Sequence, residues 1–211
     1  MSGHQKRLFT AGADPRAAAG LLLMVHGRGA SAQDILSLAP HLHAEGFAFW
    51  APQATNATWY PYPFLVPPQR NEPWLSSALA LLGDLVDEAV GLGVPREKIW
   101  LVGFSQGACL SLEFAARHAG RWGGVAGFSG GLIGDRVERS RYTGDFAGTP
   151  VFVGCSDIDM HIPVERVRES SQVMADLHGS VMERIYPGMG HTITEDELAE
   201  ANRHLFPVKG A

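Results

Sequence analysis

The pentapeptide Gly-Phe-Ser-Gln-Gly at residues 103–107 limits the possible folds of this chain more than any other segment. The apolar run before it, residues 98–102, predicts a buried strand, and the alanine-rich segment 108–118 after it predicts a helix. Gly-x-Ser-x-Gly in this setting is typical of a nucleophile elbow, which holds a strained serine with its hydroxyl free at the carboxyl edge of a sheet. A chance glycine-serine turn is the alternative. We therefore expect Ser105 to be a catalytic nucleophile.

Strand-like and helix-like segments alternate along the whole chain, which predicts an α/β fold with a mostly parallel central sheet and helices on both faces. With 211 residues and no low-complexity linker, residues 1–211 are expected to form one domain. The expected strands are residues 21–25, 47–51, 99–102, 124–128, 150–154 and 182–186, and the expected helices are residues 32–45, 74–92, 107–118, 163–178 and 194–206.

Three helix boundaries carry a local signal. Gly46 can end the first helix in a left-handed conformation, and Pro163 suits the first position of the fourth. Thr194 and Glu197 have the spacing of a capping box, in which the two side chains satisfy free backbone N–H groups at the start of the last helix.

Composition argues against several classes of function. The net charge is -5 with no basic block, so we expect no binding to nucleic acid or to anionic membranes. The polar first ten residues do not resemble a signal peptide, and no apolar run approaches the ~20 residues that span a bilayer. Cys109 and Cys155 are too few for a disulfide framework or a cysteine-rich zinc site. We therefore expect a cytoplasmic protein without integral membrane association.

A serine hydroxyl is a weak nucleophile at neutral pH and needs a base within hydrogen-bond reach. Of the nine histidines, we predict His191 as that base, because it lies in a glycine-rich loop that follows the last predicted strand. This loop should open at the same sheet edge as Ser105. The chain order serine, acid, histidine that accompanies such an elbow favours the same residue. His26 and His161 are the alternatives.

The acid should lie between Ser105 and His191 in sequence and follow a strand. Loop 155–163 meets both conditions and offers two carboxylates, Asp157 and Asp159. One would hold the histidine in the correct tautomer and stabilise its cation, while the other could cap a turn or the next helix. A metal site is the less favoured alternative, because no cluster of histidines or acids accompanies the two aspartates.

An oxyanion hole is the remaining requirement. The main-chain N–H of Gln106, the residue after the nucleophile, supplies one donor by the geometry of the elbow. The second is expected from the glycine-rich loop 26–31, in which the N–H of Arg28 is the candidate. This loop lacks the patterns Gly-Lys-Ser/Thr and Gly-x-Gly-x-x-Gly, which argues against a phosphate-binding loop.

Four short motifs occur in order along the chain: His-Gly-x-Gly at 26–29, Gly-Phe-Ser-Gln-Gly-Ala at 103–108, Asp-x-x-x-Pro at 159–163 and Gly-x-Gly-His at 188–191. Together they resemble the phospholipase/carboxylesterase family of small α/β-hydrolases, which includes carboxylesterases and acyl-protein thioesterases. The resemblance implies the α/β-hydrolase fold and a serine hydrolase that acts on carboxylic esters or thioesters, without a large lid domain.

Carried over position by position, the resemblance implies a catalytic triad of Ser105, Asp159 and His191, with Arg28 and Gln106 as oxyanion donors. The choice between the two aspartates depends on which neighbouring element is used to align the loop with the family pattern. Distance from the preceding strand favours Asp157, whereas distance to Pro163 favours Asp159, because residues 159–163 fit the family pattern Asp-Pro-x-Val-Pro without a gap. We prefer Asp159.

The chain departs from the thioesterase members after the second predicted strand, where residues 55–68 are rich in aromatic residues and proline. We predict that Trp59, Tyr60 and Tyr62 line the substrate pocket as a rigid apolar wall. The alternative is that they cap the core. We expect residues 132–149 to be a surface excursion, and the sequence assigns them no role.

Together, these expectations predict a carboxylic ester hydrolase whose reaction passes through an acyl-enzyme. Its partner is a small-molecule ester, it needs no metal or organic cofactor, and it acts as a monomer or homodimer. One alternative is a thioesterase or lysophospholipase that uses the same residues. The other is a non-catalytic binding protein that has kept the fold.

Overall fold

Residues 3–206 are described by the computed structural model. The strands are β1 (Leu8–Gly12), β2 (Leu21–Val25), β3 (Ala48–Pro52), β4 (Ile99–Phe104), β5 (Gly124–Phe128), β6 (Pro150–Ser156) and β7 (Ser180–Tyr186). The helices are α1 (Ala32–Leu36), α2 (Trp74–Gly91), α3 (Gln106–Arg117), α4 (Val164–Asp176) and α5 (Glu195–Leu205). Short 3-10 helices lie at Ala39–His41, Thr55–Ala57, Pro68–Asn71, Arg96–Lys98 and Arg139–Arg141. Within this part of the chain, no helix has the length and apolar character needed to cross a bilayer.

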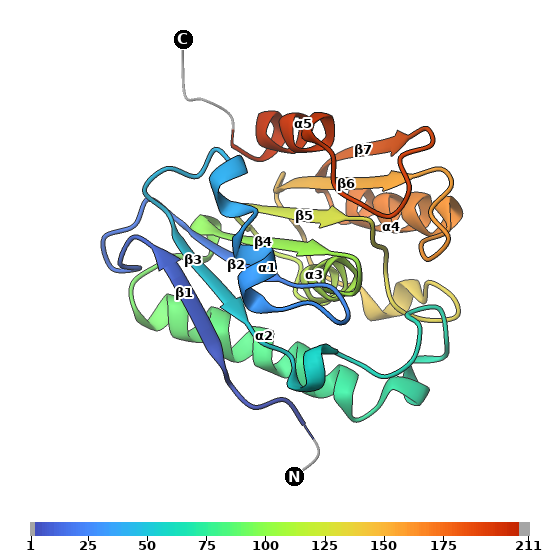
Figure 1. Cartoon of the computed structure of the whole chain (residues 1–211), viewed down its shortest axis with the longest axis horizontal. Helices are drawn as coiled ribbons and strands as arrows, with labels where there is room; N and C mark the ends of the chain where they lie inside the picture. Colours follow the sequence, from blue (N-terminus) through green and yellow to red (C-terminus); the bar gives the residue numbers. More distant parts are fainter. Residues whose placement is uncertain (1–2, 207–211) are drawn as a thin grey trace.

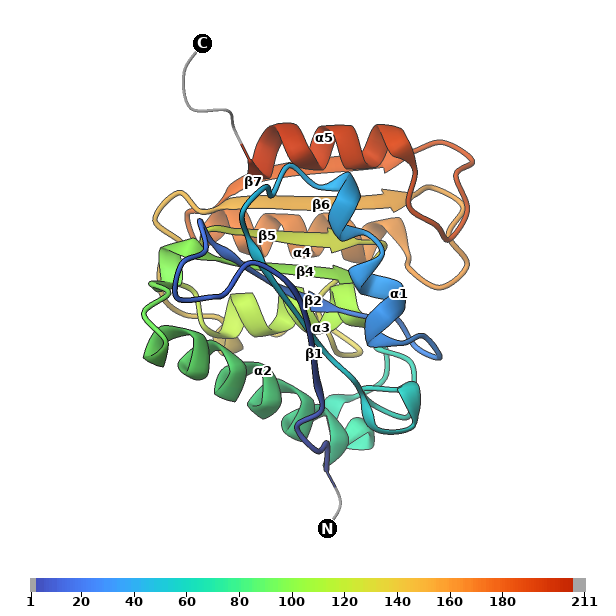
Figure 2. The same cartoon turned by 60° about the vertical axis from the view of Figure 1, so that its left-hand side comes forward.

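All seven strands belong to one sheet, in the order β1-β3-β2-β4-β5-β6-β7 (Figure 1). Every neighbouring pair is parallel except β1 and β3, which confirms the mostly parallel sheet that the sequence predicts. Helices cover both faces, as the view in Figure 2 makes clear. The carboxyl ends of the parallel strands therefore meet at one edge of the sheet.

The sheet separates two apolar cores. On β2, Leu21, Leu23 and Val25 pack into the core shared with α2, α3 and α4, whereas Leu22 and Met24 pack into the core shared with α1 and α5. Because successive side chains of a strand point to opposite faces, a strand buried on both faces must be apolar throughout. This two-sided burial explains the continuous apolar runs of the sequence.

The hydrophobic pattern does not predict β1. This strand lies at the edge of the sheet and pairs antiparallel with β3, from Leu8 opposite Pro52 to Gly12 opposite Ala48. Its first two residues are half-buried and the remaining three are exposed. An edge strand that buries so little apolar surface gives a weak sequence signal.

The prediction of one helix over residues 32–45 is confirmed for its first turn and wrong for the rest. Helix α1 ends at Leu36, and a 3-10 turn follows at Ala39–His41. Pro40 has no N–H group to donate to the carbonyl four residues earlier, so the α-helix cannot continue through it. Gly46 does have a left-handed backbone, with φ of 75°, but it belongs to the turn before β3.

Two other helix starts differ from the expectation. Pro163 precedes α4 with an extended backbone and is therefore its N-cap residue, not its first helical residue. At α5, Thr194 Oγ1 accepts a hydrogen bond from the Glu197 N–H at 3.3 Å, which is one half of the predicted capping box. The Glu197 carboxyl is fully buried instead, and neither of its oxygens has a hydrogen-bond partner among residues 3–206.

Candidate active site

Ser105 occupies a tight elbow between β4 and α3. Its φ of 56° and ψ of -120° lie in a region that residues with a Cβ rarely adopt, so the backbone here is strained. The two glycines of the elbow allow close packing. A Cβ on Gly107 would lie 2.0 Å from the Val25 carbonyl oxygen, and one on Gly103 would lie 2.3 Å from the Gly107 carbonyl oxygen. The elbow therefore needs glycine at both positions.

His191 lies in the loop after β7 and contacts both other members of a hydrogen-bonded chain. Its Nε2 lies 2.8 Å from Ser105 Oγ, and its Nδ1 lies 2.6 Å from Asp159 Oδ2. A carboxylate only accepts hydrogen bonds, so Nδ1 carries the ring proton and Nε2 is free to accept the serine proton. The rings of Phe104 and His161 pack against the imidazole, with centroids 5.1 and 4.9 Å away, and hold its orientation.

The side chain of Asp159 is fully buried and saturated with donors. Besides His191, it accepts hydrogen bonds from the N–H groups of His161 at 2.8 Å and Ile162 at 3.1 Å, both on Oδ1. Burial by itself would raise the pKa of this carboxyl, but these hydrogen bonds and the nearby imidazole outweigh burial and lower it. Asp159 is therefore held as a carboxylate at neutral pH.

Asp157 has a different position, although it lies only two residues earlier. It is exposed, and its Oδ1 accepts a hydrogen bond from the Gly188 N–H at 2.7 Å. The neighbouring Ser156 Oγ accepts one from the Gly190 N–H at 3.1 Å. Together these contacts hold the loop that carries His191. Among the described residues, no group of three or more His, Cys, Asp or Glu side chains could hold a metal ion, so the two aspartates lack such companions.

The two alternative histidines do not contact the serine. His26 is buried, with Nδ1 2.7 Å from the Gly27 carbonyl and Nε2 accepting from the Ala54 N–H at 3.1 Å. Burial lowers its pKa, an effect that the Gly27 carbonyl partly offsets. His161 is exposed and stacks edge-on against His191.

Both predicted oxyanion donors lie beside Ser105. Arg28, in the loop after β2, and Gln106, at the start of α3, line the same cavity as the serine. Within residues 3–206, the main-chain N–H groups of these two residues have no hydrogen-bond acceptor. They are therefore available to a ligand atom.

The side chains of these two residues have a second role that the sequence does not indicate. The Gln106 amide accepts from the Trp59 N–H and donates to the Tyr60 carbonyl, each at 2.9 Å. The Arg28 guanidinium donates to Thr58 Oγ1 and to the carbonyls of residues 61 and 62, at 2.9–3.0 Å. Both side chains therefore hold the aromatic loop 58–62, whose Tyr60 lines the same cavity as Ser105. No local motif predicts contacts between segments so far apart in sequence.

A cavity of about 470 Å³ opens beside Ser105. Its apolar lining comes from Tyr60, Pro63, Phe64, Cys109 and Ile162. Of these five residues, only Tyr60 is among the predicted pocket residues. Cys109 could have been found from its position one helical turn after Ser105, which places both on the same side of α3.

The predicted pocket role of Trp59 and Tyr62 is corrected. Trp59 is 0% exposed and belongs to the core, where its Nε1–H donates to the His26 carbonyl at 2.8 Å. Tyr62 is 45% exposed, and neither residue lines the cavity beside Ser105. Side chains of neighbouring residues in this irregular loop point in different directions, so of the three predicted residues only Tyr60 lines the cavity.

Comparison with known proteins identifies close relatives of this fold. The sequence profile of the phospholipase/carboxylesterase family matches residues 11–208. The crystal structure of a phospholipase/carboxylesterase from Dyadobacter fermentans is 45% identical and superposes with a TM-score of 0.95, covering 97% of this chain and 98% of that one. The Bacillus cereus carboxylesterase, 18% identical with a TM-score of 0.78 over 95% of this chain and 93% of that one, is alike in fold.

The curated relatives match a shorter part of the chain. Acyl-protein thioesterase 1 of Gibberella zeae is 31% identical over 124 residues, which cover 58% of this chain and 53% of that protein. A probable carboxylesterase of Oryza sativa subsp. japonica is 30% identical over 114 residues, covering 54% of this chain and 43% of that protein. The chain therefore spans about half the length of the curated relatives it matches.

Proposed function

The chain belongs to the phospholipase/carboxylesterase family, and on this premise we propose that it is a serine hydrolase that cleaves carboxylic esters. The observation that carries the proposal is the hydrogen-bonded chain from Asp159 through His191 to Ser105, with links of 2.6 and 2.8 Å, beside a cavity with a largely apolar lining. This arrangement has the geometry that activates a serine hydroxyl.

The first half of the reaction forms an acyl-enzyme. Ser105 Oγ attacks the ester carbonyl carbon while His191 Nε2 takes the hydroxyl proton. The Asp159 carboxylate stabilises the resulting imidazolium. The main-chain N–H groups of Arg28 and Gln106 donate to the oxygen that becomes negatively charged in the tetrahedral intermediate. When this intermediate collapses, the carbon–oxygen bond to the alcohol breaks and the alcohol leaves with the proton from Nε2.

The second half releases the acid. A water molecule attacks the acyl carbon, and His191 Nε2 takes the proton of that water. The second tetrahedral intermediate then collapses, its bond to Ser105 Oγ breaks, and the serine recovers its proton from Nε2. No charge or proton is left over, so the free enzyme is restored after each cycle.

A thioesterase or lysophospholipase is the second candidate. The acyl-protein thioesterases among the relatives favour it. The same residues serve both reactions, because a thioester gives an analogous tetrahedral intermediate, from which a thiol leaves with the proton from His191 Nε2 in place of an alcohol. Rates on p-nitrophenyl esters and on acyl-coenzyme A thioesters of equal chain length would rank the two candidates.

The nucleophile can be tested by covalent labelling. An alkyl phosphonofluoridate reacts only with an activated serine, so intact-mass analysis should show one addition to the wild-type protein and none to Ser105→Ala. Ser111→Ala is the matched control, since Ser111 is a buried serine of α3 outside the site and its removal should leave labelling unchanged. Equal labelling of Ser105→Ala and wild type would refute the proposal.

The cellular setting is part of the same proposal. We place the protein in the cytoplasm as a monomer or homodimer, and its free, buried cysteines Cys109 and Cys155 support a reducing compartment. Cell fractionation tests the location, and light scattering after size-exclusion chromatography tests the oligomeric state.

A further inference from the structure

The segment after β5 is held by a buried arginine of α4. Arg166 is 7% exposed, and its Nη1 donates to the carbonyls of Leu132 at 2.9 Å and Gly134 at 2.6 Å. One turn further along α4, Ser170 Oγ accepts from the Leu132 N–H at 2.8 Å. Because α4 follows the loop of Asp159, these contacts tie the segment to one side of the candidate site.

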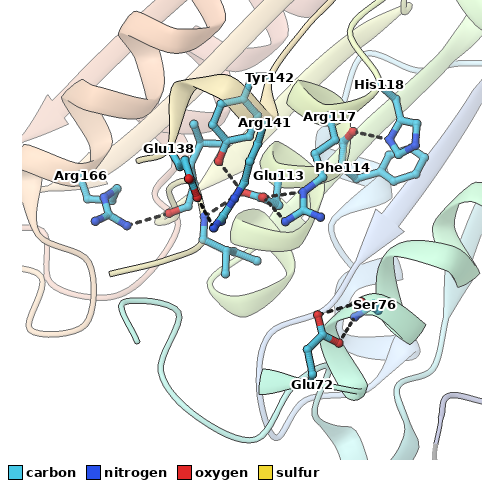
Figure 3. Close-up of polar contacts among 12 residues, drawn as sticks. Glu72, Ser76, Glu113, Phe114, Arg117, His118, Glu138, Arg141, Tyr142 and Arg166 are labelled. Atoms are coloured by element: carbon cyan, nitrogen blue, oxygen red, sulfur yellow. Dashed lines mark hydrogen bonds and ion pairs between the residues drawn. The ribbon is translucent and has the colours of Figure 1, made fainter. Parts of the chain in front are cut away.

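A buried carboxylate of α3 holds the same segment from the other side. Glu113 is 0% exposed and accepts from the Ile133 N–H at 2.9 Å and the Tyr142 hydroxyl at 3.0 Å. Figure 3 shows its carboxyl between this hydroxyl and the guanidinium of Arg117, which lies 2.7 Å away. Residues 132–142 therefore bridge the helices that follow Ser105 and Asp159.

This bridge continues to the wall of the cavity. The N–H of Gly134 donates to the carbonyl of Phe64 at 2.8 Å, and the Arg166 guanidinium carbon lies 6.0 Å from the centre of the Phe64 ring. Phe64 itself is 6% exposed and lines the cavity beside Ser105. Gly134 has a φ of 136°, and a Cβ there would lie 2.9 Å from the Arg136 carbonyl oxygen. Few backbone conformations satisfy these contacts, so the position of Phe64 is tightly defined.

We propose that Arg166 is a positioning residue that fixes Phe64 as the end wall of the acyl cavity, and that the two residues together limit the length of the acyl chain. The proposal rests on the proposed ester hydrolase function. Its physical basis is the planar guanidinium, which donates to the carbonyls of Leu132, Gly134 and Asp135 and lies against an aromatic ring at the same time. Without it, the buried carbonyls of Leu132 and Gly134 lose their partner, so the segment and Phe64 should shift together.

A double-mutant cycle tests whether Arg166 acts through Phe64. We would measure kcat/KM on p-nitrophenyl butyrate and p-nitrophenyl dodecanoate for wild type, Phe64→Ala, Arg166→Met and the double variant. Phe64→Ala should raise the ratio of long-chain to short-chain kcat/KM by roughly 10-fold or more, since each methylene accommodated in an apolar pocket contributes strongly to binding. Arg166→Met should raise the same ratio by a smaller factor than Phe64→Ala does. In the double variant, the ratio should equal that of Phe64→Ala alone.

Arg96→Met is the matched control for loss of stability. Like Arg166, Arg96 lies over an aromatic ring, 3.9 Å from the centre of Trp122, and donates to a main-chain carbonyl, that of His118. Unlike Arg166, it precedes β4 and so lies at the amino ends of the parallel strands, away from the candidate site. This variant should lower the melting temperature and leave the chain-length ratio unchanged. If Arg166→Met does not fold, Arg166→Lys replaces it. Lysine keeps the positive charge but lacks the planar guanidinium, so this variant should raise the chain-length ratio by a smaller factor than Phe64→Ala does.

Three results would overturn the inference while the proposed function stands. An unchanged ratio in Phe64→Ala would show that Phe64 is not the end wall. An unchanged ratio in the folded Arg166 variants, or an equal rise in Arg96→Met, would reduce Arg166 to a general stabilising role. Failure of the proposed function itself would appear differently, as a wild-type protein that hydrolyses neither ester.

Discussion

The Nδ1 atom of His191 lies 2.6 Å from Oδ2 of Asp159, whereas Asp157 in the same loop accepts from the Gly188 N–H. We therefore expect Asp159→Asn to keep the fold but to lower kcat by up to about 10⁴-fold, because an amide can hold the wrong imidazole tautomer. Asp157→Asn is the matched variant and should cost much less, through a looser His191 loop. Ester hydrolysis, with circular dichroism to check folding, measures both. A larger loss in Asp157→Asn would exclude Asp159 as the acid.

The strained backbone of Ser105 predicts a conflict between stability and activity. Ser105→Gly and Ser105→Ala should both abolish turnover, but the glycine variant should be more stable by about 1 kcal/mol, because only it removes the Cβ from a backbone with φ of 56°. Urea unfolding measures the difference.

The matching glycine and alanine variants of Ser111, in α3, should show the opposite order of stability. Ser111 lies inside α3, where glycine is about 1 kcal/mol less favourable than alanine. Ser111→Gly should therefore be less stable than Ser111→Ala. Equal stabilities of the two Ser105 variants would mean that the elbow is not strained.

Trp59 should behave as a core residue and not as a specificity residue. It is 0% exposed, so Trp59→Ala should lower the free energy of unfolding by about 3–5 kcal/mol. The ratio of rates on long and short esters should not change. Tyr62→Ala removes an exposed aromatic ring from the same loop and should alter stability by less than about 0.5 kcal/mol. If Trp59→Ala did change the chain-length preference, Trp59 would be a pocket residue and this prediction would be wrong.

The buried carboxyl of Glu197 should make stability depend on pH. Burial raises the pKa of this carboxyl from the ordinary value of 4.5 to about 8. Between these two pH values the unfolded chain has released this proton while the folded protein retains it. The free energy of unfolding should therefore fall as pH rises through this range, by at most about 1.4 kcal/mol per pH unit, and level off above it.

Glu197→Gln resembles the protonated carboxyl and should flatten this dependence. Glu195→Gln is the matched control, since Glu195 is an exposed residue of the same helical turn and should keep the wild-type slope. Urea unfolding between pH 5 and pH 9 measures all three proteins. A wild-type slope in Glu197→Gln would assign the effect to another group.

The α/β architecture, and the end of the sheet at which the loops of the candidate site meet, follow from local sequence patterns. Continuous apolar strands alternating with helices require a parallel sheet buried on both faces, and the carboxyl ends of parallel strands lie at one edge. The loops of Arg28, Ser105, Asp159 and His191 all follow such strands. Local patterns were sufficient here, because they depend on the period of the chain and on which residues can form an elbow.

Which side chain within each loop faces which partner depends instead on how the packed chain brings distant segments together. Asp157 and Asp159 differ by two positions, and Trp59 and Tyr60 by one, yet the members of each pair contact different parts of the molecule. In an irregular loop the direction of a side chain depends on hydrogen bonds from distant segments, such as those of Gly188 and Gln106. A local motif contains no information on those contacts, because they exist only once the chain is packed.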